Sequence, residues 1–587
     1  MSKRILEPGV CLFFLFYLYP FCSRMEYVLT GLTAEYAGIV LLVVFMAFSL
    51  YRKDSWEFHW ADFLFLLLVC WYGWRLAAGD EPPDDRIVTR SAGCLLLYIY
   101  FRWEYPGDYF WGLLFGAGIL RATWGISQRL FFLPALPFRL SENGGFGNSA
   151  LWGIFSVLAF LAGCMVYGHC RKSAIKWIWG IGMSLLLLAV FLSASRASWV
   201  ALAVGSIWLV AFSDRGRTIA DNFRQRYNGM PLLLFSVIAC ICACGIAYGL
   251  YALRPASVEG RFLIWRVIAG AVGNAPWVGH GALSASYMPL QAEWLARHPN
   301  AACAMLADNN IYAFNEPLRI LFECGIIGLL LFLGTLVMTF RAALRGNRSA
   351  RGASGVLAAV MCFGLFGYPL TAVPIAIVVI IALAIMVSGR NSKNYLTIIT
   401  FSRISRCAII IVLACFLAFC TEQFIRGKRA DRLLLQARTE PAILSDGELL
   451  HCYQHWQGNP DFVLCYGKTL YDHERYAEAL PVLRRGACLK PSSQLLCDLG
   501  DCYHFCGDRE RAVASYQLAA RMTPARILPP YRLFCLYRDD GLETQAEEQA
   551  HHLLDMPVKV VNTSVLRYRH QARLFLNNRQ SSNHKQP

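Results

Sequence analysis

Three arginines at the edges of apolar segments are the residues of this sequence best suited to hold an anion. Arg196 lies in FLSASRASWVAL, between two apolar segments and without an acidic neighbour in sequence. Charge is costly inside an apolar environment, so this position predicts an anionic partner; the alternative is a side chain that snorkels to the membrane interface. Arg261 and Arg266 follow in EGRFLIWR. Because the planar guanidinium offers two parallel hydrogen bonds to phosphate oxygens, we expect Arg196 and Arg261 to clamp a diphosphate.

Arg261 and Arg266 cannot both face one point if their segment is helical. Five residues on an α-helix turn through roughly 500°, so the two side chains diverge by about 140°. We therefore expect one arginine to bind an anion and the other to pair elsewhere, for instance with Glu259.

The stretch GNAPWVGHG, residues 273–281, predicts a tight turn after a helical segment. Pro276 and two glycines, Gly279 and Gly281, shape this turn, and the glycines allow a close approach of the backbone. His280 is a candidate base or ligand, although a lone histidine is more often structural. His298 is a further candidate base in the same segment.

Asn315 and Glu316 stand just before Pro317, which is typical of the first turn of a helix that begins an apolar segment. Glu316 either interacts favourably with the helix dipole or serves as a general base at the membrane surface, with Asn315 as a second candidate catalytic residue. Glu323 lies seven residues further on about the same helical face, within the apolar FECGIIG that also contains Gly325. An acid there is expensive and usually has a purpose.

The composition indicates the kind of protein in which these residues lie. Of 587 residues, 56% are hydrophobic and only 16% are charged, whereas a soluble chain carries about a quarter of charged residues. Apolar runs near the ~20-residue bilayer length recur up to about residue 419. We predict an all-α polytopic bundle of about 12 to 13 spans within a membrane domain over residues 1–422. The predicted spans are 9–22, 35–51, 62–77, 91–102, 108–121, 150–169, 177–194, 197–212, 231–252, 318–340, 354–370, 372–388 and 407–421.

Basic residues alternate between loops in a way that predicts the orientation. If Lys3 and Arg4 are cytoplasmic, the other arginine- and lysine-rich loops fall on the same side, and the acidic stretch 79–85 falls opposite. The N-terminal segment lacks a cleavage signal, so we expect it to be an uncleaved first span. The loop over residues 254–317 and the C-terminal tail are then predicted to lie outside the cytoplasm.

Beyond Glu422, charges become frequent and no apolar run is long enough to cross a bilayer, which predicts a second domain over residues 423–587. Laid against itself at an offset of about 33 to 34 residues, this tail repeats across about residues 460–560. Small residues recur at helix-crossing positions, and a proline closes each of the first two units, while the third unit is weaker. The pattern resembles the tetratricopeptide repeat, predicts an α-helical solenoid, and favours a protein or peptide partner; the alternative is a structural cap. The repeat residues are Gly467, Ala479, Leu483 and Pro491, then Gly500, Tyr503, Ala512, Tyr516, Ala519 and Pro524, then Tyr537, Gly541 and Ala546.

Charge and cysteine usage exclude other classes. The net charge is +16, but the basic residues are placed in short loops, so we expect no nucleic-acid partner. The 22 cysteines form no pair of C-x-x-C motifs, so we expect no metal site. The tail cysteines either pack as small residues between helices or pair as disulfides outside the cytoplasm. They are Cys452, Cys465, Cys488, Cys497, Cys502, Cys506 and Cys535.

The order of these motifs resembles one known family. Ser-Arg follows an apolar segment; then come G-R-x-x-x-W at 260–265, N-x-P-x-x-G-x-G at 274–281, and N-E with a downstream E-x-G-I-I-G-L at 315–329. GGFGN at 144–148 precedes them and supplies Asn148. The series is similar to the O-antigen ligase and O-antigen polymerase superfamily, including protein O-oligosaccharyltransferases, most strongly over about residues 140–335.

The resemblance implies an inverting, multi-pass glycosyltransferase of the bacterial inner membrane. Such enzymes take a glycan linked to undecaprenyl diphosphate and move it whole to an acceptor hydroxyl on the periplasmic face, without cofactor or metal. Arg196 and Arg261 match the arginines that hold the diphosphate in that family. The acceptor is lipid A-core, an exported protein or a growing glycan, and the helical tail tilts this choice modestly towards a protein.

The sequence departs from the family at one position. Many members have histidine immediately before the asparagine that corresponds to Asn315, and this chain has Phe314 there. The histidine base therefore has no counterpart, and we take Glu316 as its replacement. Three other readings stay open: a polymerase, an inactive envelope scaffold that acts through its repeats, and a transporter, which would more often show internal repeats and interrupted helices.

Overall fold

The computed structural model describes residues 29–52, 55–77, 85–106, 109–130, 142–167, 173–213, 255–298, 302–388, 396–440 and 447–583, with isolated residues between 216 and 252. These residues are almost entirely helical, which confirms the predicted all-α membrane fold class. One short antiparallel strand pair, β1 (Ser55–Phe58) and β2 (Thr397–Thr400), is an addition that the sequence analysis did not foresee. The predicted spans 9–22 and 231–252 and most of the acidic stretch 79–85 lie outside the described residues. So do the basic residues Lys3, Arg4, Lys53, Arg171, Lys172, Arg215, Arg217, Arg224, Arg226, Arg254, Arg390 and Lys393.

The chain divides into two compact units. The membrane unit comprises Met1–Ala78, Asp85–Ala252 and Phe314–Leu435, and the loop–tail unit comprises Gly79–Asp84, Leu253–Ala313 and Gln436–Pro587. The predicted boundary at residues 422–423 lies inside one continuous helix, α17. Most of the predicted loop 254–317 therefore clusters with the tail instead of with the membrane helices.

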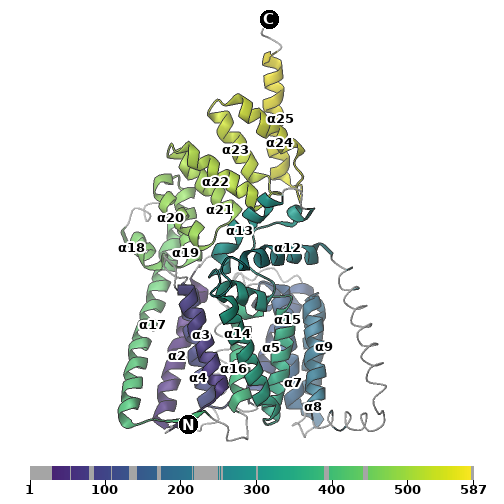
Figure 1. Ribbon diagram of the computed structural model, residues 1–587, viewed down its shortest axis with the longest axis vertical. Coiled ribbons are helices and arrows are strands. Elements are labelled where there is room, and N and C mark those ends of the chain that lie inside the picture. Colours follow the sequence, from purple (N-terminus) through teal and green to yellow (C-terminus); the bar gives the residue numbers. More distant parts are fainter. Residues whose placement is uncertain are drawn as a thin grey trace. The chain divides into compact units, whose positions relative to one another are not determined.

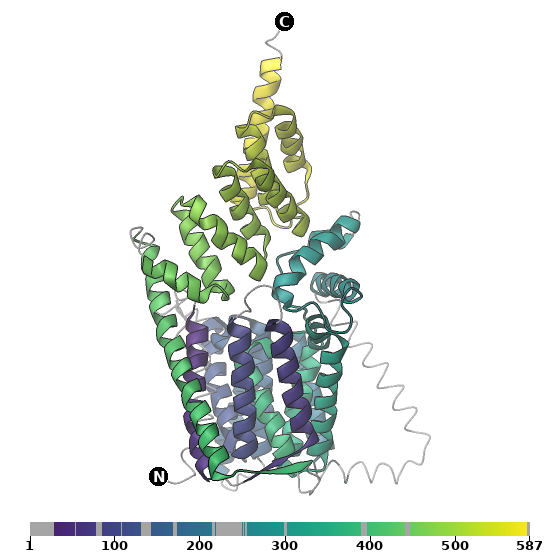
Figure 2. The same ribbon diagram turned by 60° about the vertical axis from the view of Figure 1, so that its left-hand side comes forward.

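In the membrane unit, the described helices run side by side as a bundle (Figures 1 and 2). Five of them are long and apolar enough to cross a bilayer, and three shorter apolar helices accompany them. They are α2 (Thr30–Arg52), α3 (Trp60–Ala77), α4 (Asp85–Trp103), α5 (Tyr109–Leu130), α6 (Glu142–Gly145), α7 (Ser149–Tyr167), α8 (Ser173–Leu192), α9 (Arg196–Ala211), α14 (Glu316–Leu344), α15 (Arg348–Gly364), α16 (Val373–Ser388) and α17 (Arg403–Ala437), with the 3₁₀ turn η2 (Pro369–Thr371). The predicted spans agree closely with the bounds of α3, α7, α8, α9, α14 and α16. Helices α2 and α4 begin before their predicted starts, α15 lies earlier in the chain than its predicted span, and α5 and α17 extend well beyond their predicted ends. The short α6 had not been predicted.

Helix α14 is broken at Gly325, where the backbone adopts φ 67° and ψ −168°. This conformation favours glycine, which explains why the apolar FECGIIG run carries one. The break frees the Cys324 carbonyl, and the Trp71 indole of α3 donates a 3.1 Å hydrogen bond to it. An unsatisfied carbonyl inside a bilayer would be expensive, so Trp71 is the residue that makes the kink tolerable.

In the loop–tail unit, the described part of Leu253–Ala313 forms three elements, and the described part of the tail forms eight helices (Figure 1). Successive tail helices pack in antiparallel pairs, α19 with α20, α21 with α22, and α23 with α24. The elements are α12 (Pro255–Val272), α13 (Leu283–Arg297) and η1 (Ala302–Leu306), then α18 (Gly447–Trp456), α19 (Pro460–Asp472), α20 (Tyr476–Leu489), α21 (Ser493–Phe505), α22 (Arg509–Met522), α23 (Leu528–Asp539), α24 (Glu543–Asp555) and α25 (Thr563–Asn583).

Equivalent glycines stand where the tail helices cross. A Cβ on Gly467 would lie 2.6 Å from Leu483, and one on Gly500 would lie 2.5 Å from the Tyr516 ring. These contacts follow the repeat read from the sequence, while the assignment to the tetratricopeptide family stays a prediction. Buried Asp501 of α21 links the α19–α20 pair to the α21–α22 pair. It accepts 2.6 Å hydrogen bonds from the hydroxyls of Tyr471 on α19 and Tyr516 on α22.

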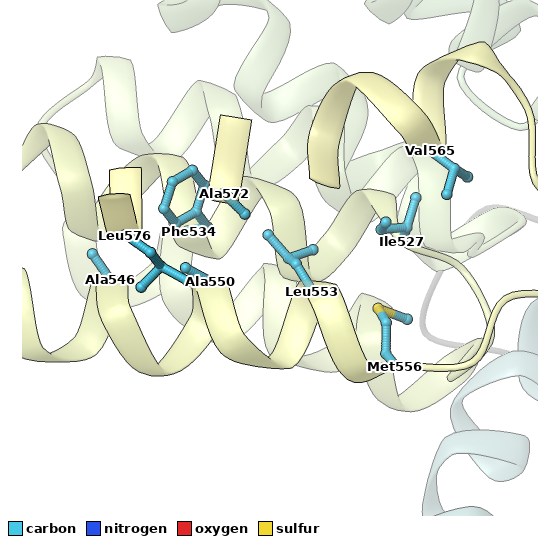
Figure 3. Packing of buried hydrophobic residues seen from close by; sticks show 9 residues of the cluster. All are labelled: Ile527, Phe534, Ala546, Ala550, Leu553, Met556, Val565, Ala572 and Leu576. Carbon is cyan, nitrogen blue, oxygen red and sulfur yellow. The ribbon is translucent and has the colours of Figure 1, made fainter. Parts of the chain in front are cut away.

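The last helix closes the array with apolar side chains. Val565, Ala572 and Leu576 of α25 bury themselves against Phe534 of α23 and Leu553 of α24 (Figure 3). A terminal repeat needs such a cover, because its inner face would otherwise meet water.

Candidate functional site

Residues 365–372, the connection between α15 and α16, join three of the motif residues predicted from the sequence. Asn315 donates from Nδ2 to the Leu365 carbonyl at 3.2 Å, and Glu316 Oε1 accepts from the Leu370 backbone N–H at 2.9 Å. Asn148 donates from Nδ2 to the Tyr368 hydroxyl at 2.6 Å. Side chains from two distant segments, Asn148 and the adjacent pair Asn315–Glu316, thus converge on one short connection within the membrane unit.

Glu316 is a buried structural carboxylate in this arrangement. Its side chain is only 1% exposed, and Oε2 accepts from Arg319 Nε at 2.8 Å and Nη2 at 2.7 Å. A buried ion pair of this kind is strongly destabilised when one partner is removed. Both oxygens are engaged, so the geometry favours a positioning role for Glu316 over the role of general base expected from the sequence.

Glu323 extends the same network about two helical turns further along α14. Tyr72 of α3 donates a 3.0 Å hydrogen bond to Glu323 Oε2, and Arg319 lies 3.6 Å from the same oxygen. Arg319 therefore balances two acids on one face of α14. Glu323, the acid in this apolar run, therefore has two partners. Arg319 lies one helical turn earlier on α14, and Tyr72 comes from α3.

Asn315 caps α14, since its Oδ1 accepts from the Leu318 N–H at 2.8 Å. Phe314, which stands where many family members have histidine, adopts a positive φ of 51°. Its ring lies edge-on to Tyr368, with the centroids 5.1 Å apart. The residue before the cap is thus held by an aromatic contact to the residue that Asn148 also binds.

Arg196 is the first residue of α9, directly after the N-cap Ser195. The N-terminus of a helix carries partial positive charge, so its position adds to the side chain's suitability for an anion. Ser198 contacts the Ala150 carbonyl at 3.4 Å, which places the start of α9 beside the start of α7 and near Asn148. Arg196 and Asn148 therefore share one end of the membrane unit.

Arg261 and Arg266 lie on α12 in the loop–tail unit, Arg261 half-buried and Arg266 exposed. Between them, Trp265 donates from Nε1 to the Ala313 carbonyl at 2.9 Å. The helical conformation supports the predicted divergence of the two arginines. Both arginines belong to the loop–tail unit, whereas Arg196 belongs to the membrane unit.

The predicted turn at 273–281 is present. Gly279 and Gly281 have φ of 75° and 79°, which explains both glycines, and Pro276 stands in the turn. His280 Nε2 lies 2.7 Å from the Ala271 carbonyl. If Nε2 carries the proton of this hydrogen bond, Nδ1 is the basic nitrogen of the ring. His298 is exposed and stacks on Trp294.

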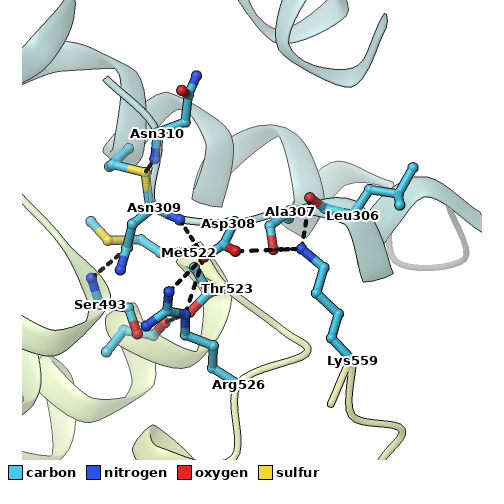
Figure 4. Close-up of polar contacts among 12 residues, drawn as sticks. Leu306, Ala307, Asp308, Asn309, Asn310, Ser493, Met522, Thr523, Arg526 and Lys559 are labelled. Carbon is cyan, nitrogen blue, oxygen red and sulfur yellow. Dashed lines mark hydrogen bonds and ion pairs between the residues drawn. The ribbon is translucent and has the colours of Figure 1, made fainter. Parts of the chain in front are cut away.

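The loop segment is fastened to the tail by polar contacts (Figure 4). Arg526 donates to Asp308 Oδ1 from Nη2 at 2.7 Å, and the Ser493 N–H donates to Asn309 Oδ1 at 2.9 Å. Lys559 contacts the Leu306 carbonyl at 3.1 Å. Helix α13 also packs on α20 and α22, and its buried Gln291 donates to the Met522 carbonyl at 2.7 Å.

The seven tail cysteines are thiols in this structure, so the disulfide alternative receives no support from it. Burial raises the pKa of Cys502 to about 12, which keeps this thiol protonated and unreactive. Within the described ranges, no three His, Cys, Asp or Glu side chains gather as metal ligands.

Several residues of the site were missed by the sequence analysis. Arg319 pairs with Glu316, Tyr368 accepts a hydrogen bond from Asn148, and Trp71 donates to the Cys324 carbonyl at the break in α14. Arg121 of α5 is also buried, donates to the Gly144 carbonyl at 3.3 Å, and lies 4.9 Å from the Phe146 ring, so it holds the GGFGN element. An arginine within an apolar segment was the signal available for Arg121 and Arg319, just as it was for Arg196.

Fold and site together define the class: an all-α membrane protein whose buried polar network gathers at the starts of α7, α9 and α14. The comparison with known families adds the particular group. A family model described as O-antigen ligase (Wzy_C) matches residues 181–333, from within α8 to within α14. This match over residues 181–333 supports the resemblance to the O-antigen ligase superfamily that was read from the sequence. No curated protein matches the chain significantly.

This family supports a membrane glycan-transfer or polymerase-type function, and it suggests a glycosyltransferase-like enzyme. The matched segment contains Arg196, both α12 arginines, His280 and the Asn315–Glu316 pair. The chemistry-bearing residues selected from the sequence therefore lie in the part of the chain that defines the family.

Proposed function

We propose that the protein transfers a glycan en bloc from an undecaprenyl-diphosphate carrier to an acceptor hydroxyl at the periplasmic face of a bacterial inner membrane. The observation that carries this proposal is the family match over residues 181–333, which spans all the proposed diphosphate ligands. The N-terminus would be cytoplasmic and the loop–tail unit periplasmic, as the loop charges predict.

In the proposed reaction, the acceptor oxygen attacks C1 of the first sugar while the bond from C1 to the diphosphate oxygen breaks. Undecaprenyl diphosphate leaves with the electron pair of that bond, and a single displacement of this kind inverts the configuration at C1. Arg196, at the N-terminus of α9, and Arg261 stabilise the negative charge that develops on the leaving group. Arg266 provides a further cation on α12.

The acceptor proton goes to a base, and we assign this role to His280 in preference to Glu316. Glu316 would have to break its ion pair with Arg319 in order to take a proton, which a low-dielectric setting disfavours. His280 engages the Ala271 carbonyl through Nε2, and its other ring nitrogen is the candidate acceptor of the proton. Glu316, Asn315 and Asn148 then act as positioning residues through the α15–α16 connection.

The test is a transfer assay with the purified protein and an undecaprenyl-diphosphate oligosaccharide, with lipid A-core and an exported Ser/Thr-containing protein offered side by side. Arg196→Ala, Arg261→Ala and His280→Gln should each lower transfer by about 100-fold or more at unchanged abundance. Arg345→Ala, at the exposed C-terminal end of α14, is the matched control and should retain full transfer.

The outcomes separate the remaining functions. Glycan on one acceptor identifies the ligase or the oligosaccharyltransferase. A lipid donor that only lengthens identifies the polymerase. Absence of transfer and of lengthening in the unmodified protein would contradict the proposal and favour an envelope scaffold that acts through its helical tail.

A further inference from the structure

The outward face of α12 and of the turn after it carries large apolar side chains that the loop–tail unit leaves uncovered. Phe262 is 45% exposed, and in the turn Trp277 is 65% exposed with Val278 beside it. The opposite face of α12 is buried, with Leu263 and Val267 inward, and the helix packs on α13 and η1. The exposure is therefore a property of one face of an otherwise well-packed helix.

Cations accompany these apolar residues. Arg266 is exposed one turn after Phe262, and Arg261 directly precedes it. A helix that presents aromatic side chains together with arginines has the composition of elements that lie in the plane of a membrane interface. Tryptophan is the side chain most typical of that layer, because its ring is apolar and its N–H is polar.

Chain connectivity ties α12 to the segment that leads into α14. The 2.9 Å hydrogen bond from Trp265 fastens α12 to Ala313, and α14 begins three residues later at Glu316. Three residues span at most about 10 Å. Helix α14 is long and apolar enough to cross a bilayer, so its start is expected at a boundary between lipid and water.

We propose that Phe262, Trp277 and Val278 insert into the lipid headgroup layer on the side of the membrane where α14 begins. Helix α12 then lies along the interface, and Arg261 and Arg266 are held at the depth of lipid phosphates. The proposal is independent of the reaction proposed above, because it concerns contact with bulk phospholipid and not with a glycan donor.

The experiment uses the full-length protein in nanodiscs of phosphatidylethanolamine and phosphatidylglycerol. An environment-sensitive fluorescent amino acid replaces Trp277 or Phe262 in separate variants. Phe505, a 60% exposed aromatic residue on tail helix α21, is replaced in the same way as the matched control. Nitroxide lipids labelled at the headgroup, at acyl carbon 5 or at acyl carbon 12 serve as quenchers, with iodide as the aqueous quencher.

Insertion should make lipid quenching at 277 and 262 at least about threefold stronger than at 505, with the headgroup and carbon-5 labels more effective than carbon 12. Iodide should quench the label at 505 more strongly than the label at 277. Equal iodide quenching at 277 and 505 would place this face in water and overturn the proposal. Weak quenching at 277 by every probe would show that protein covers the face, and would overturn it equally.

Discussion

Arg526 of the tail donates two hydrogen bonds, from Nε at 3.2 Å and from Nη2 at 2.7 Å, to the same carboxylate oxygen of Asp308. These residues are far apart in sequence and join the segment before α14 to the connection between α22 and α23. The helical tail is therefore built into the loop that carries His280, Arg261 and Arg266.

Reversing one charge of this pair should loosen the loop segment. For Arg526→Asp we expect amide exchange at residues 306–310 to rise by about fivefold, which corresponds to about 1 kcal/mol for a partly exposed ion pair. The measurement is hydrogen exchange on the full-length protein.

The double variant Asp308→Arg with Arg526→Asp should recover much of the protection. Arg538→Asp, which breaks an exposed pair with Asp539 on α23, is the matched control and should leave the loop unchanged. Equal exchange in Arg526→Asp and in the unmodified protein would show that the pair contributes nothing to docking.

The same contact predicts a dependence of stability on pH. Burial opposes ionisation of Asp308, but the hydrogen bonds and charges of Arg526 and Lys559 outweigh it and lower the pKa of Asp308 below its ordinary 3.8. A lowered pKa in the folded state gives stability that is present above the unfolded pKa and is lost as the pH falls through the folded one. The carboxylate is half exposed, so we expect only about 0.5 kcal/mol after screening.

The measurement is the difference in melting temperature between the unmodified protein and Asp308→Asn from pH 7 down to pH 3. The difference should be constant from pH 7 to pH 5 and should shrink below about pH 4. A difference that grows on acidification would contradict the assigned sign.

Removal of the Glu316 carboxylate should destabilise the membrane unit. Glu316→Ala leaves the buried Arg319 short of one partner and should cost about 3 kcal/mol, seen as a lower yield of folded protein and a lower melting temperature in detergent. Glu316→Gln can still accept from the Leu370 N–H and should lose less. Loss of transfer with an unchanged melting temperature in both variants would restore Glu316 as the general base.

The kink of α14 should depend on two residues. Gly325→Ala forces an L side chain to φ 67° and should cost about 1–3 kcal/mol. Trp71→Phe leaves the Cys324 carbonyl without its indole donor and should cost about 1–2 kcal/mol. Both variants act on the same kink, so their effects on the melting temperature should not be additive. Full additivity would mean that the indole does not support the kink.

A methyl group at a helix crossing tests the packing of the tail. In Gly500→Ala the new Cβ meets the Tyr516 ring and should cost about 1–3 kcal/mol of tail stability. Gly447→Ala, at the start of α18 with open space around it, is the matched control and should be neutral or slightly stabilising. Urea unfolding followed by far-UV circular dichroism measures both, and equal midpoints would contradict the close crossing.

The class of this protein could be predicted from hydropathy and from the order of its motifs. Apolar runs of bilayer length force helices, because a backbone in lipid must satisfy its own hydrogen bonds. Hence the bounds of α3, α7, α9 and α14 could be predicted from hydropathy. The order of short motifs around Arg196, Arg261 and Asn315 likewise pointed to the family whose model matches residues 181–333, since each motif is local in the chain.

Only the tertiary structure decided which side chains these motifs contact. Hydropathy says that Glu316 and Glu323 need partners, but whether Arg319 supplies them or leaves the carboxylates open for chemistry depends on how α3, α14 and the α15–α16 connection pack. Tyr368 and Leu370 carry no motif, and they matter because the fold brings them to Asn148 and Glu316. The packing of the loop segment on the tail could not be predicted from the sequence either. The contact of Asp308 with Arg526 spans a sequence separation of 218 residues, and local patterns hold no information about such pairs.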